Sequence, residues 1–402
     1  MLDPKAIRSQ FPLLLREISG EPIVYLDSAA TSQKPDAVLE AMMNVYRTSN
    51  ANAHRGMHPL AEEATQQYEK ARATVQKFLN AKYAEEIVFT KSCTEAINLV
   101  AHTVSQQDHI VLSLLEHHSN IIPWMQRDAH IHWTNLSDLE EILRTHTISL
   151  VAITGQSNVL GIRPPIEEII QLSHAAGAKV LVDAAQLVAH HPIHVQKLDC
   201  DFLTFSSHKL YGPTGIGVLY AKRECLEEMS PMLGGGGMVY SIAEQSFTPL
   251  GIPEKFEAGT PPVADAIGLA TAIDWLAHYD WKDIEEYEQH LLRHAEEVLT
   301  TIPGLTILNL QPHSAKAPRG DLQPQSGCIS FTLAAVHPHD LTEILGRQGI
   351  CLRAGHHCAQ PIHKHLGIAA STRLSVGIYN TIEEINLLPS AIEHAQHVLA
   401  TT

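Results

Sequence analysis

The sequence predicts an α/β protein in which a large, mostly parallel β-sheet with helices on both faces is joined to a smaller α+β domain. Apolar strand-like runs and helical patterns alternate between residues 86 and 182, and this alternation is typical of parallel strands connected by helices. After about residue 262 the pattern changes to two consecutive helices followed by separated strands. A chain of 402 residues is long enough for two or three domains with a large core.

Apolar spacing predicts the elements of the amino-terminal part. Residues 3–17 are expected to be helical, residues 23–26 to form a short strand, and residues 27–31 to form a turn. A helix is predicted over 59–80, where the apolar residues at helical spacing are Leu60, Ala64, Tyr68, Ala71, Val75 and Phe78.

The alternating part of the chain supplies the predicted large sheet. Its expected strands are 86–89, 109–112, 149–153, 179–182 and the apolar run that begins at Asp201. Helices are expected from about Ser92, from about Asn120 and over 165–176.

The carboxyl-terminal part predicts the smaller domain. Helices are expected over 263–279, 283–301 and 338–348, and strands over 304–309 and 327–333. A last helix is expected to begin near Thr381, because Thr381 and Glu384 have the spacing of a capping box. The Pro- and Gln-bearing stretch 311–326 is predicted to be an exposed loop.

The composition argues against several classes of protein. The net charge of −16 disfavours a nucleic-acid-binding protein, which should be basic. No stretch approaches 18 uninterrupted apolar residues, and residues 1–25 lack the apolar core of a signal peptide, so neither a membrane span nor secretion is expected. Six cysteines without framework spacing favour free thiols and a cytoplasmic location. The 26 histidines are mostly scattered, and we predict no metal site.

Lys209 and Asp183 are the most informative residues of the chain. Lys209 ends the turn Ser-Ser-His-Lys that follows an apolar strand, and a poorly solvated lysine among backbone donors suits an imine with an aldehyde cofactor. Asp183 ends another apolar strand upstream. Pyridoxal phosphate needs both groups, one as imine former and one as partner of its ring nitrogen. Taken alone, Lys209 would more often be a surface lysine.

Three segments predict a site for the phosphate of this cofactor. Small polar residues between Lys91 and Asn98 occupy a predicted helix start, where free backbone N–H groups bind anions. An ordinary helix cap explains this stretch equally well. Ser206 and His208 would supply further donors to the same phosphate.

Two side chains are candidates for contacts with the cofactor ring. His117, in Glu-His-His-Ser after the strand at 109, would stack on the ring and exchange protons near neutral pH, although histidine pairs are more often structural. Gln186 follows Asp183 closely enough to reach the ring hydroxyl.

Cys358 is the candidate nucleophile. It lies in a loop that contains Gly355 and two preceding histidines, and nearby Arg or His charge would favour its thiolate. Arg373 is a candidate for a bidentate clamp on a substrate carboxylate, or else a surface ion pair. Zinc is the rival interpretation of the loop, with His356, His357, Cys358, His363 and His365 as ligands.

These motifs closely resemble the pyridoxal-phosphate cysteine desulfurases of the SufS/CsdA type, in the class V aminotransferase family. The resemblance runs nearly from end to end of the chain. Its carriers are Leu26-Asp-Ser-Ala-Ala-Thr31, His54-Arg-Gly56, Thr94-Glu-Ala-Ile-Asn98, Glu116-His-His118, Ser157-Asn-Val-Leu-Gly161, Val182-Asp-Ala-Ala-Gln186, Ser206-Ser-His-Lys209, Phe256-Glu-Ala-Gly-Thr260 and Arg353-Ala-Gly-His-His-Cys-Ala-Gln-Pro361.

The resemblance implies a homodimer of the fold type I transferases, with a seven-stranded sheet. Residues 25–279 would form the large cofactor-binding domain, and 1–24 with 280–402 the small domain that carries the Cys358 loop. It implies that Lys209 holds the cofactor, Asp183 pairs with its ring nitrogen, His117 stacks on the ring and Gln186 reaches the phenolic oxygen. The implied phosphate ligands are Cys93, Thr94, Ser206, His208 and Thr260 of the other subunit, and the implied substrate-binding residues are Asn158, Arg353 and Arg373.

The chain departs from the family pattern at a few positions. Cys93 stands where relatives usually have Thr, so one phosphate contact is expected to be weaker. Ser207 replaces a usual Gly, Gly155-Gln156 replaces a common His-Val pair, and the segment 104–108 is short. No catalytic group is lost by these changes.

The resemblance implies conversion of L-cysteine to L-alanine through a persulfide on Cys358. The sulfur would pass to an acceptor of the SufE or SufU type for iron–sulfur cluster assembly. Selenocysteine lyase and other class V lyases such as kynureninase are the alternative enzymes. A sulfur-carrying scaffold and a zinc-binding module are alternatives of other classes.

Overall fold

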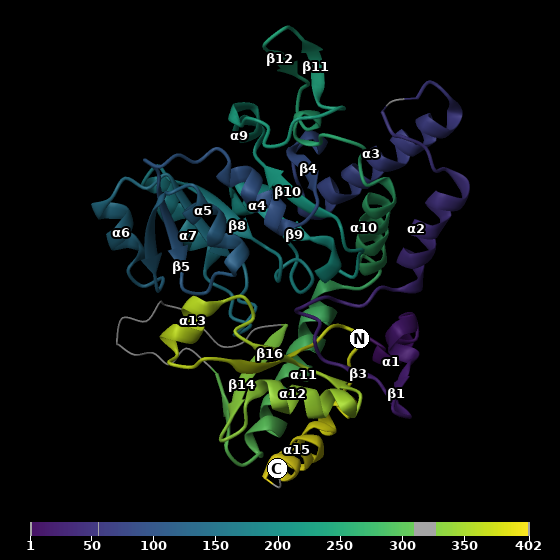
Figure 1. The fold of residues 1–402 in the computed structure, drawn as a ribbon, viewed down its shortest axis with the longest axis vertical. Coiled ribbons are helices and arrows are strands. Elements are labelled where there is room, and N and C mark those ends of the chain that lie inside the picture. The colour runs from purple at the N-terminus through teal and green to yellow at the C-terminus, as the bar shows by residue number, and fades with distance from the viewer. Residues whose placement is uncertain (1, 55, 309–326, 401–402) are drawn as a thin grey trace.

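The structure is a computed structural model that describes residues 2–54, 56–308 and 327–400. At its centre is a seven-stranded sheet in the order β4-β10-β9-β8-β7-β5-β6 (Figure 1). The strands from β9 to β6 are mutually parallel, and β10 is antiparallel to both of its neighbours. The predicted large, mostly parallel sheet is therefore confirmed. The strand bounds are β4 Ile87–Thr90, β5 His109–Ser113, β6 His130–Thr134, β7 Leu150–Thr154, β8 Lys179–Asp183, β9 Phe202–Ser206 and β10 Gly217–Ala221.

The central strands are almost continuously apolar because helices cover both of their faces. Successive residues of β7 point to opposite sides, so Val151 and Ile153 join one core cluster while Leu150 and Ala152 join another. The first cluster includes residues of α3 (Pro59–Leu79), α7 (Ile166–Ala175) and α10 (Val263–Leu276). The second includes residues of α4 (Cys93–Ala101) and α5 (Ile122–Gln126).

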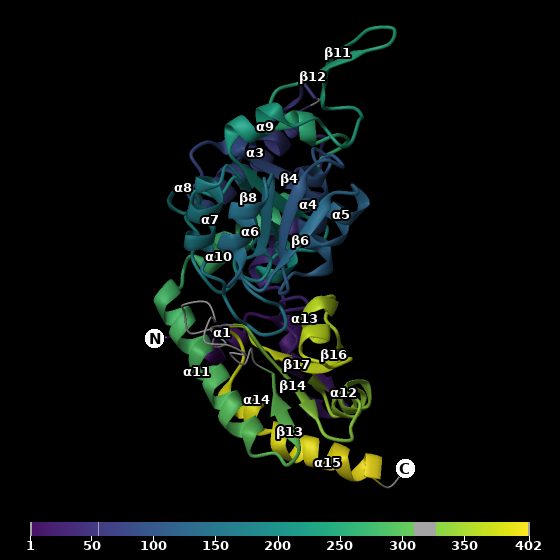
Figure 2. The same cartoon turned by 90° about the vertical axis from the view of Figure 1, so that its left-hand side faces the viewer.

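A four-stranded antiparallel sheet in the order β13-β14-β17-β16 forms the smaller part of the molecule. Its bounds are β13 Leu305–Ile307, β14 Cys328–Leu333, β16 Arg353–Gly355 and β17 Ser371–Ser375. Helices α11 (Trp281–Thr300), α12 (Pro338–Arg347), α14 (Ile382–Asn386) and α15 (Leu388–Ala400) share a separate apolar core with this sheet. Figure 2 shows the long helix α11 running along one side of this part, with α15 at its far end.

The amino-terminal helix predicted over 3–17 is wrong in its extent. Helix α1 covers only Pro4–Arg8, and a short 3-10 turn covers Pro12–Leu15. Pro12 disfavours a helical backbone at the residue before it, and Phe11 accordingly has extended dihedral angles (φ −110°, ψ 98°).

Phe11 is a contact point between distant parts of the chain. Its ring lies edge-on to those of Tyr211, Trp275 and Tyr379, with centroid distances of 6.1, 5.3 and 4.8 Å. A little further on, β3 (Val24–Tyr25) pairs in parallel with β15 (Ile350–Cys351) of the smaller part. The amino-terminal segment thus packs on both parts, and the predicted domain limits at residues 24/25 and 279/280 stay a prediction.

Several elements were not predicted. Helix α2 (Asp36–Thr48) buries only Val38 and Val45, and the edge strand β6 is largely polar. Also missed were α6 (Leu139–Thr145), α9 (Arg223–Glu228) and the hairpin of β11 (Val239–Ile242) and β12 (Phe247–Pro249), which projects from the body (Figure 1). The predicted loop 311–326 and Arg55 lie outside the described residues. Within the described parts of the chain, no helix is long and apolar enough to cross a membrane.

Arg72 and Glu257 form a buried ion pair that ties α3 to β4. Arg72 donates to Glu257 from Nη1 at 2.7 Å and from Nη2 at 2.9 Å, and to the Ile87 carbonyl at 2.8 Å. Glu257 also accepts the Phe89 N–H at 2.7 Å. Arg72 also pairs with the half-exposed Glu69, at 2.9 and 3.2 Å, so removal of Glu257 leaves the Arg72 charge only partly compensated and the Phe89 N–H without its acceptor.

Glu257→Ala is therefore expected to lower the free energy of unfolding by about 3–5 kcal/mol. Urea unfolding of the cofactor-free protein, followed by circular dichroism, measures this change. The control is Glu228→Ala, which breaks the exposed Lys179–Glu228 pair and should cost less than about 1 kcal/mol. Equal losses for the two variants would contradict the structural importance of the buried pair.

Candidate active site

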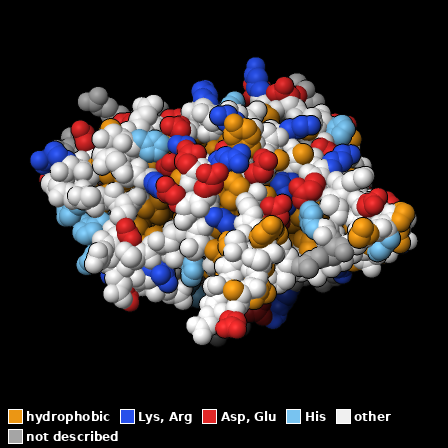
Figure 3. Space-filling view, turned by 90° about the horizontal axis from the view of Figure 1, so that it is seen from above, with side chains coloured by type: hydrophobic (Ala, Val, Ile, Leu, Met, Phe, Trp, Pro, Cys, Tyr) orange, Lys and Arg blue, Asp and Glu red, His pale blue; other side chains and the backbone are white. Residues whose placement is uncertain are grey.

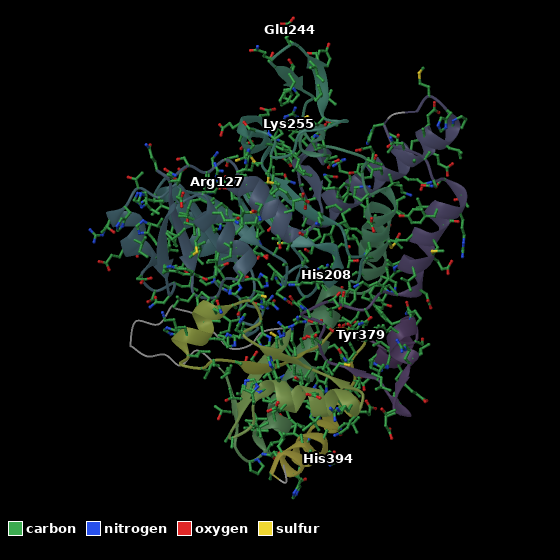
Figure 4. The ribbon with its side chains drawn as sticks, in the orientation of Figure 1. Arg127, His208, Glu244, Lys255, Tyr379 and His394 are labelled. Carbon is green, nitrogen blue, oxygen red and sulfur yellow. The ribbon has the colours of Figure 1, made fainter. Side chains whose placement is uncertain are left out.

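A cavity of about 240 Å³ lies at the carboxyl ends of the parallel strands, where residues of both parts of the molecule meet. Every predicted site residue except Thr260 lines it, namely Cys93, Thr94, His117, Asn158, Asp183, Gln186, Ser206, His208, Lys209, Arg353, Cys358 and Arg373. Figure 4 shows His208 between the large sheet and the smaller part below it. Thr260 is exposed and lines other cavities, with residues such as Tyr68 and Gly237, so its predicted role in a second subunit stays a prediction.

Asp183 and Lys209 both line this cavity, one with a carboxyl group and the other with an amine. Asp183 is the last residue of β8, and Lys209 lies in the 3-10 turn that follows β9. Burial lowers the pKa of Lys209, while the negative charge of Asp183 opposes that shift. Burial likewise raises the pKa of Asp183, and the Ala185 N–H and the Lys209 charge oppose it. An amine whose pKa is lowered is more often neutral, and a neutral amine is the nucleophile that an aldehyde requires.

The start of helix α4 is held close to the sheet. Ser92 caps the helix by accepting the Glu95 N–H, and the Cys93 N–H donates to Ser206 Oγ at 2.8 Å. Gly217 of β10 permits this approach, because a Cβ there would lie 2.4–2.7 Å from the Ser92 and Cys93 backbones. The Cys93 and Glu95 N–H groups are thus already bonded, and among the described residues the Thr94 N–H is the one in this turn that remains for an anion.

Thr94 and His208, two further predicted phosphate ligands, also line the cavity. Thr94 is exposed, and its hydroxyl shares a hydrogen bond of 2.8 Å with Ser119. Burial and the charges of Lys209 and Lys34 lower the pKa of His208 to about 4. A neutral His208 can still donate one N–H to an anion.

His117 is neutral at physiological pH. Burial and the nearby Lys209 charge lower its pKa to about 3. Its Nδ1 accepts the Ser119 backbone N–H at 3.1 Å, so the ring proton of the neutral form belongs on Nε2. The lowered pKa disfavours the protonated ring, and the expected proton exchange by His117 stays a prediction.

Glu116 anchors the segment that carries His117. It is fully buried and accepts hydrogen bonds from Ser113 Oγ (2.6 Å), the Thr154 N–H (2.9 Å) and Asn120 Nδ2 (2.7 Å). These bonds join the ends of β5 and β7. Burial raises the pKa of Glu116 to about 8, although all three donors favour the ionised form.

Arg353 and Arg373 are cross-strand neighbours on β16 and β17. Asp27 lies between them and accepts from Arg353 at 3.3 Å and from Arg373 at 3.1 Å. Arg373 is buried and also donates to the Asn158 carbonyl at 2.9 Å, while its Nε has no hydrogen-bond partner among the described residues. These two guanidinium groups bring positive charge to the cavity, as carboxylate binding requires.

The Cys358 loop has an unusual backbone. His357 and Cys358 both have positive φ, at 52° and 54°, a conformation that costs energy for residues other than glycine. Two hydrogen bonds hold the loop in place: Asn158 Nδ2 donates to the His357 carbonyl, and the His118 N–H donates to the Cys358 carbonyl, both at 2.7 Å. The Cys358 side chain is exposed at the cavity.

Two histidines of the histidine-rich loop bond to the same serine. His357 Nε2 and His363 Nε2 both hydrogen-bond to Ser371 Oγ, at 3.1 and 2.9 Å. Among the residues that the structure describes, no group of three or more His, Cys, Asp or Glu side chains is placed to hold a metal ion.

Sequence reasoning missed several lining residues, and most of them neighbour a predicted one. They are Ala29, Ala30, Ser119, Thr154, Gln156, Ala185 and His357. Ala29 and Ala30 lie within a motif that was recognised, and Ser119 follows the His117 motif directly. Their closeness in sequence to these motifs could have indicated them, but closeness in sequence does not show which side chains face the cavity.

The residues present fit pyridoxal phosphate. Asp183 keeps Oδ2 without a partner among the described residues, and Gln186 uses its amide N–H to hold the Ala29 carbonyl at 2.8 Å. The cavity also holds an amine of lowered pKa and the start of α4 at Thr94. One ring-nitrogen partner, one imine former and one anion site therefore face a single space.

Comparison with known proteins places the chain in a family. The model of the aminotransferase class-V family matches residues 24–388. A cysteine desulfurase of an Enterobacter species is 44% identical, with 98% of each chain covered, and one of Escherichia coli is 41% identical at the same coverage. The crystal structure of the cysteine desulfurase CsdA from Escherichia coli superposes with a TM-score of 0.87 at 39% identity, covering 99% of both chains.

The chain thus belongs to the class V aminotransferases, which depend on pyridoxal phosphate, and the family resemblance seen in the sequence is confirmed. Its full-length relatives include the cysteine desulfurases named above. The roles of individual residues stay predictions at this point.

His357 gives the fold a dependence on pH. Burial and the Arg373 charge lower its pKa from 6.5 to about 2. Below pH 6.5 the unfolded chain binds a proton at this residue that the folded chain does not bind, so stability falls as the pH falls. For this one group, the free energy of unfolding falls by up to about 1.4 kcal/mol for each unit by which the pH is lowered.

His357→Gln is therefore expected to weaken the pH dependence of unfolding between pH 7 and 5, while it retains a donor for Ser371. Urea unfolding of the cofactor-free protein at several pH values measures the slope. The exposed His394 is the control, because His394→Gln should leave the slope unchanged. If the slope in His357→Gln equals that of the wild type, His357 is not the source of this pH dependence.

Proposed function

We propose that this protein is a cysteine desulfurase that converts L-cysteine to L-alanine and leaves the sulfur on Cys358. The observation that carries the proposal is that Lys209, Asp183 and Cys358 line one cavity. The 41–44% identity to full-length cysteine desulfurases supports it. When bound, pyridoxal phosphate supplies an electron sink for the substrate carbon.

In this proposal the cofactor is held by groups from several strand ends. Lys209 forms the covalent link, Asp183 partners the ring nitrogen, His117 stacks on the ring and Gln186 lies near the ring hydroxyl. The phosphate would bind at the start of α4, between Thr94, Ser206 and His208. The Cys93 N–H belongs to the same turn, and its donation to Ser206 Oγ orients that hydroxyl.

Substrate binding would use the positive side of the cavity. Arg373 presents its guanidinium at the cavity beside Arg353, and the carboxylate of cysteine matches their fork of donors. Asn158 lies against the Cys358 loop through its hydrogen bond to His357. A carboxylate bound here would have its thiol-bearing carbon within the space that Lys209 and Cys358 share.

The chain supplies both a base and a nucleophile. The Lys209 amine, whose pKa burial lowers, would take the proton from the substrate α-carbon. The Cys358 thiolate would then form an S–S bond with the substrate sulfur as the carbon–sulfur bond breaks. The bond electrons remain with the substrate carbon, which takes up a proton and leaves as alanine, and Cys358 retains a persulfide.

We further propose that the protein acts as a homodimer in the cytoplasm. The β11–β12 hairpin exposes Tyr240 (77%), Ile242 (79%) and Phe247 (52%), and apolar side chains are also visible among the charged ones on that end of the molecule (Figure 3). Burial of this hairpin against a second copy would remove the apolar surface from water, with Thr260 nearby in the same half. A reducing compartment would preserve the six free cysteines.

The exposed position of Cys358 suits transfer of the persulfide sulfur to an acceptor protein of the SufE or SufU type. That sulfur would serve iron–sulfur cluster assembly. An exposed thiol in a loop can meet both the substrate within the cavity and a partner at its mouth.

Two substitutions separate the proposed roles. Cys358→Ala should keep the visible absorption of the bound cofactor but lose protein-bound persulfide, with alanine release from cysteine at least about a hundredfold slower, because the nucleophile is gone. Lys209→Ala should lose the covalent link and its absorption band. Anaerobic incubation with cysteine, scored for alanine and persulfide together, tests both.

Cys351→Ala is the matched control, since Cys351 is a second partly exposed thiol nearby in the chain. It should retain full activity. Persulfide formation by the Cys358→Ala protein would refute the role of Cys358. Faster turnover of selenocysteine by that variant than of cysteine by the wild type would favour selenocysteine lyase instead.

A further inference from the structure

Cys93 is a buried thiol that the proposed reaction does not use. It is the first residue of α4, is 5% exposed and lines the cavity. Its Sγ lies 3.3 Å from Asp183 Oδ1 and 3.2 Å from Thr204 Oγ1. The thiol therefore contacts the carboxylate that is proposed to partner the cofactor ring nitrogen.

The chemistry of these groups sets the direction of the hydrogen bonds. An ionised carboxylate can only accept, so the single S–H proton of Cys93 points to Asp183 Oδ1. The sulfur then accepts the hydroxyl proton of Thr204. The result is a relay in which Thr204 donates to Cys93 and Cys93 donates to Asp183.

Asp183 Oδ1 receives a second donor from the chain. The Ala185 N–H donates to the same oxygen at 3.0 Å. Both donors act on Oδ1, and no partner is present for Oδ2 among the residues that the structure describes. Two donors on one oxygen prevent rotation of the carboxylate and turn Oδ2 toward the cavity.

Cys93 is itself rigidly placed. Its N–H donates to Ser206 Oγ at 2.8 Å, and Gly217 packs directly against its backbone nitrogen. The contact with Asp183 is therefore a feature of the packed fold. A loose side chain with several rotamers would not provide it.

We propose that Cys93 is a positioning residue that orients Asp183 and strengthens its hold on the protonated ring nitrogen of the cofactor. The proposal rests on the cofactor dependence of the family and on Asp183 as ring partner. It does not require that the substrate be cysteine.

The charge states agree with this arrangement. Burial and the Asp183 charge raise the pKa of Cys93 well above its usual value, so the thiol keeps its proton as a donor. Burial raises the pKa of Asp183, while the Ala185 N–H, the Lys209 charge and the Cys93 thiol act in the opposite direction. The thiol thus favours the ionised carboxylate that a pyridinium requires.

The test uses full-length holoenzyme loaded with pyridoxal phosphate that carries ¹⁵N in its ring. The ¹⁵N chemical shift reports protonation of the ring nitrogen directly, and we titrate it from pH 6 to 10. In Cys93→Ala the midpoint for loss of the ring proton should fall by about one pH unit, a roughly tenfold weaker hold. The bound cofactor should also dissociate several-fold faster into an excess of trap.

Two companion variants separate positioning from general packing. Cys93→Ser retains a donor and should restore the wild-type titration, whereas Thr204→Val should shift the midpoint in the same direction as Cys93→Ala but less. Cys200→Ala removes another fully buried thiol away from the cavity and should change nothing. If Cys93→Ala does not fold, the proposal is tested by the other two variants: Cys93→Ser should keep the wild-type midpoint and Thr204→Val should lower it.

Titration curves that coincide for the wild type and Cys93→Ala would overturn the proposal, as would a Cys93→Ser curve that matches Cys93→Ala. A wild-type ring nitrogen that is unprotonated at pH 6 would overturn the role of Asp183, and the Cys93 proposal with it. If the titration midpoints shift among the variants as expected but the enzyme releases no alanine from cysteine, the Cys93 proposal is supported and only the proposed function is refuted.

Discussion

The negative charge of Asp27 is the constraint on which the geometry of the site depends. Antiparallel pairing of β16 and β17 sets Arg353 directly opposite Arg373, and two like charges at such positions repel each other. Asp27 accepts hydrogen bonds from both guanidinium groups and offsets that repulsion. Asp27 follows β3 and forms a β-bridge with Ser375 of β17, so the amino-terminal segment is joined to the small sheet beside these arginines.

The strain in the Cys358 loop is compensated by this same framework. Arg373 donates to the Asn158 carbonyl, and Asn158 in turn donates to the carbonyl of His357. Two consecutive residues with positive φ are thus held by hydrogen bonds to their carbonyl groups, while the Cys358 side chain takes no part in them. A backbone fixed in this way leaves the thiol exposed and free to react.

The electrostatics of the cavity favour anions. Lys209, Arg353 and Arg373 line it, and their charges help to keep His117 and His357 neutral. Asp183 is the acidic side chain that lines the same cavity in the described chain. A phosphate and a carboxylate would each find positive charge or a free N–H group here, while a protonated ring nitrogen would find the carboxylate.

The sequence determined most of the strand-end chemistry of this protein. In parallel sheets the carboxyl ends of the strands meet at one edge, so the order of apolar runs is enough to place the residues that end them, such as Asp183 and Lys209, close together. Local patterns also predicted the sheet and most of its helices. They failed over 3–17, where Pro12 interrupts the helix, and at the polar edge strand β6, whose apolar alternation is weak.

Only the tertiary structure decided which groups from distant parts of the chain form hydrogen bonds and ion pairs with each other. Asp27 lies more than 300 residues from the two arginines that it joins, and the Cys93 thiol reaches Asp183 because Gly217 lets α4 approach the sheet. No local pattern records such contacts, since each depends on how separate elements pack and on the close fit of their side chains. The sequence therefore specified which reactive groups the protein carries, and packing specified their partners and their protonation.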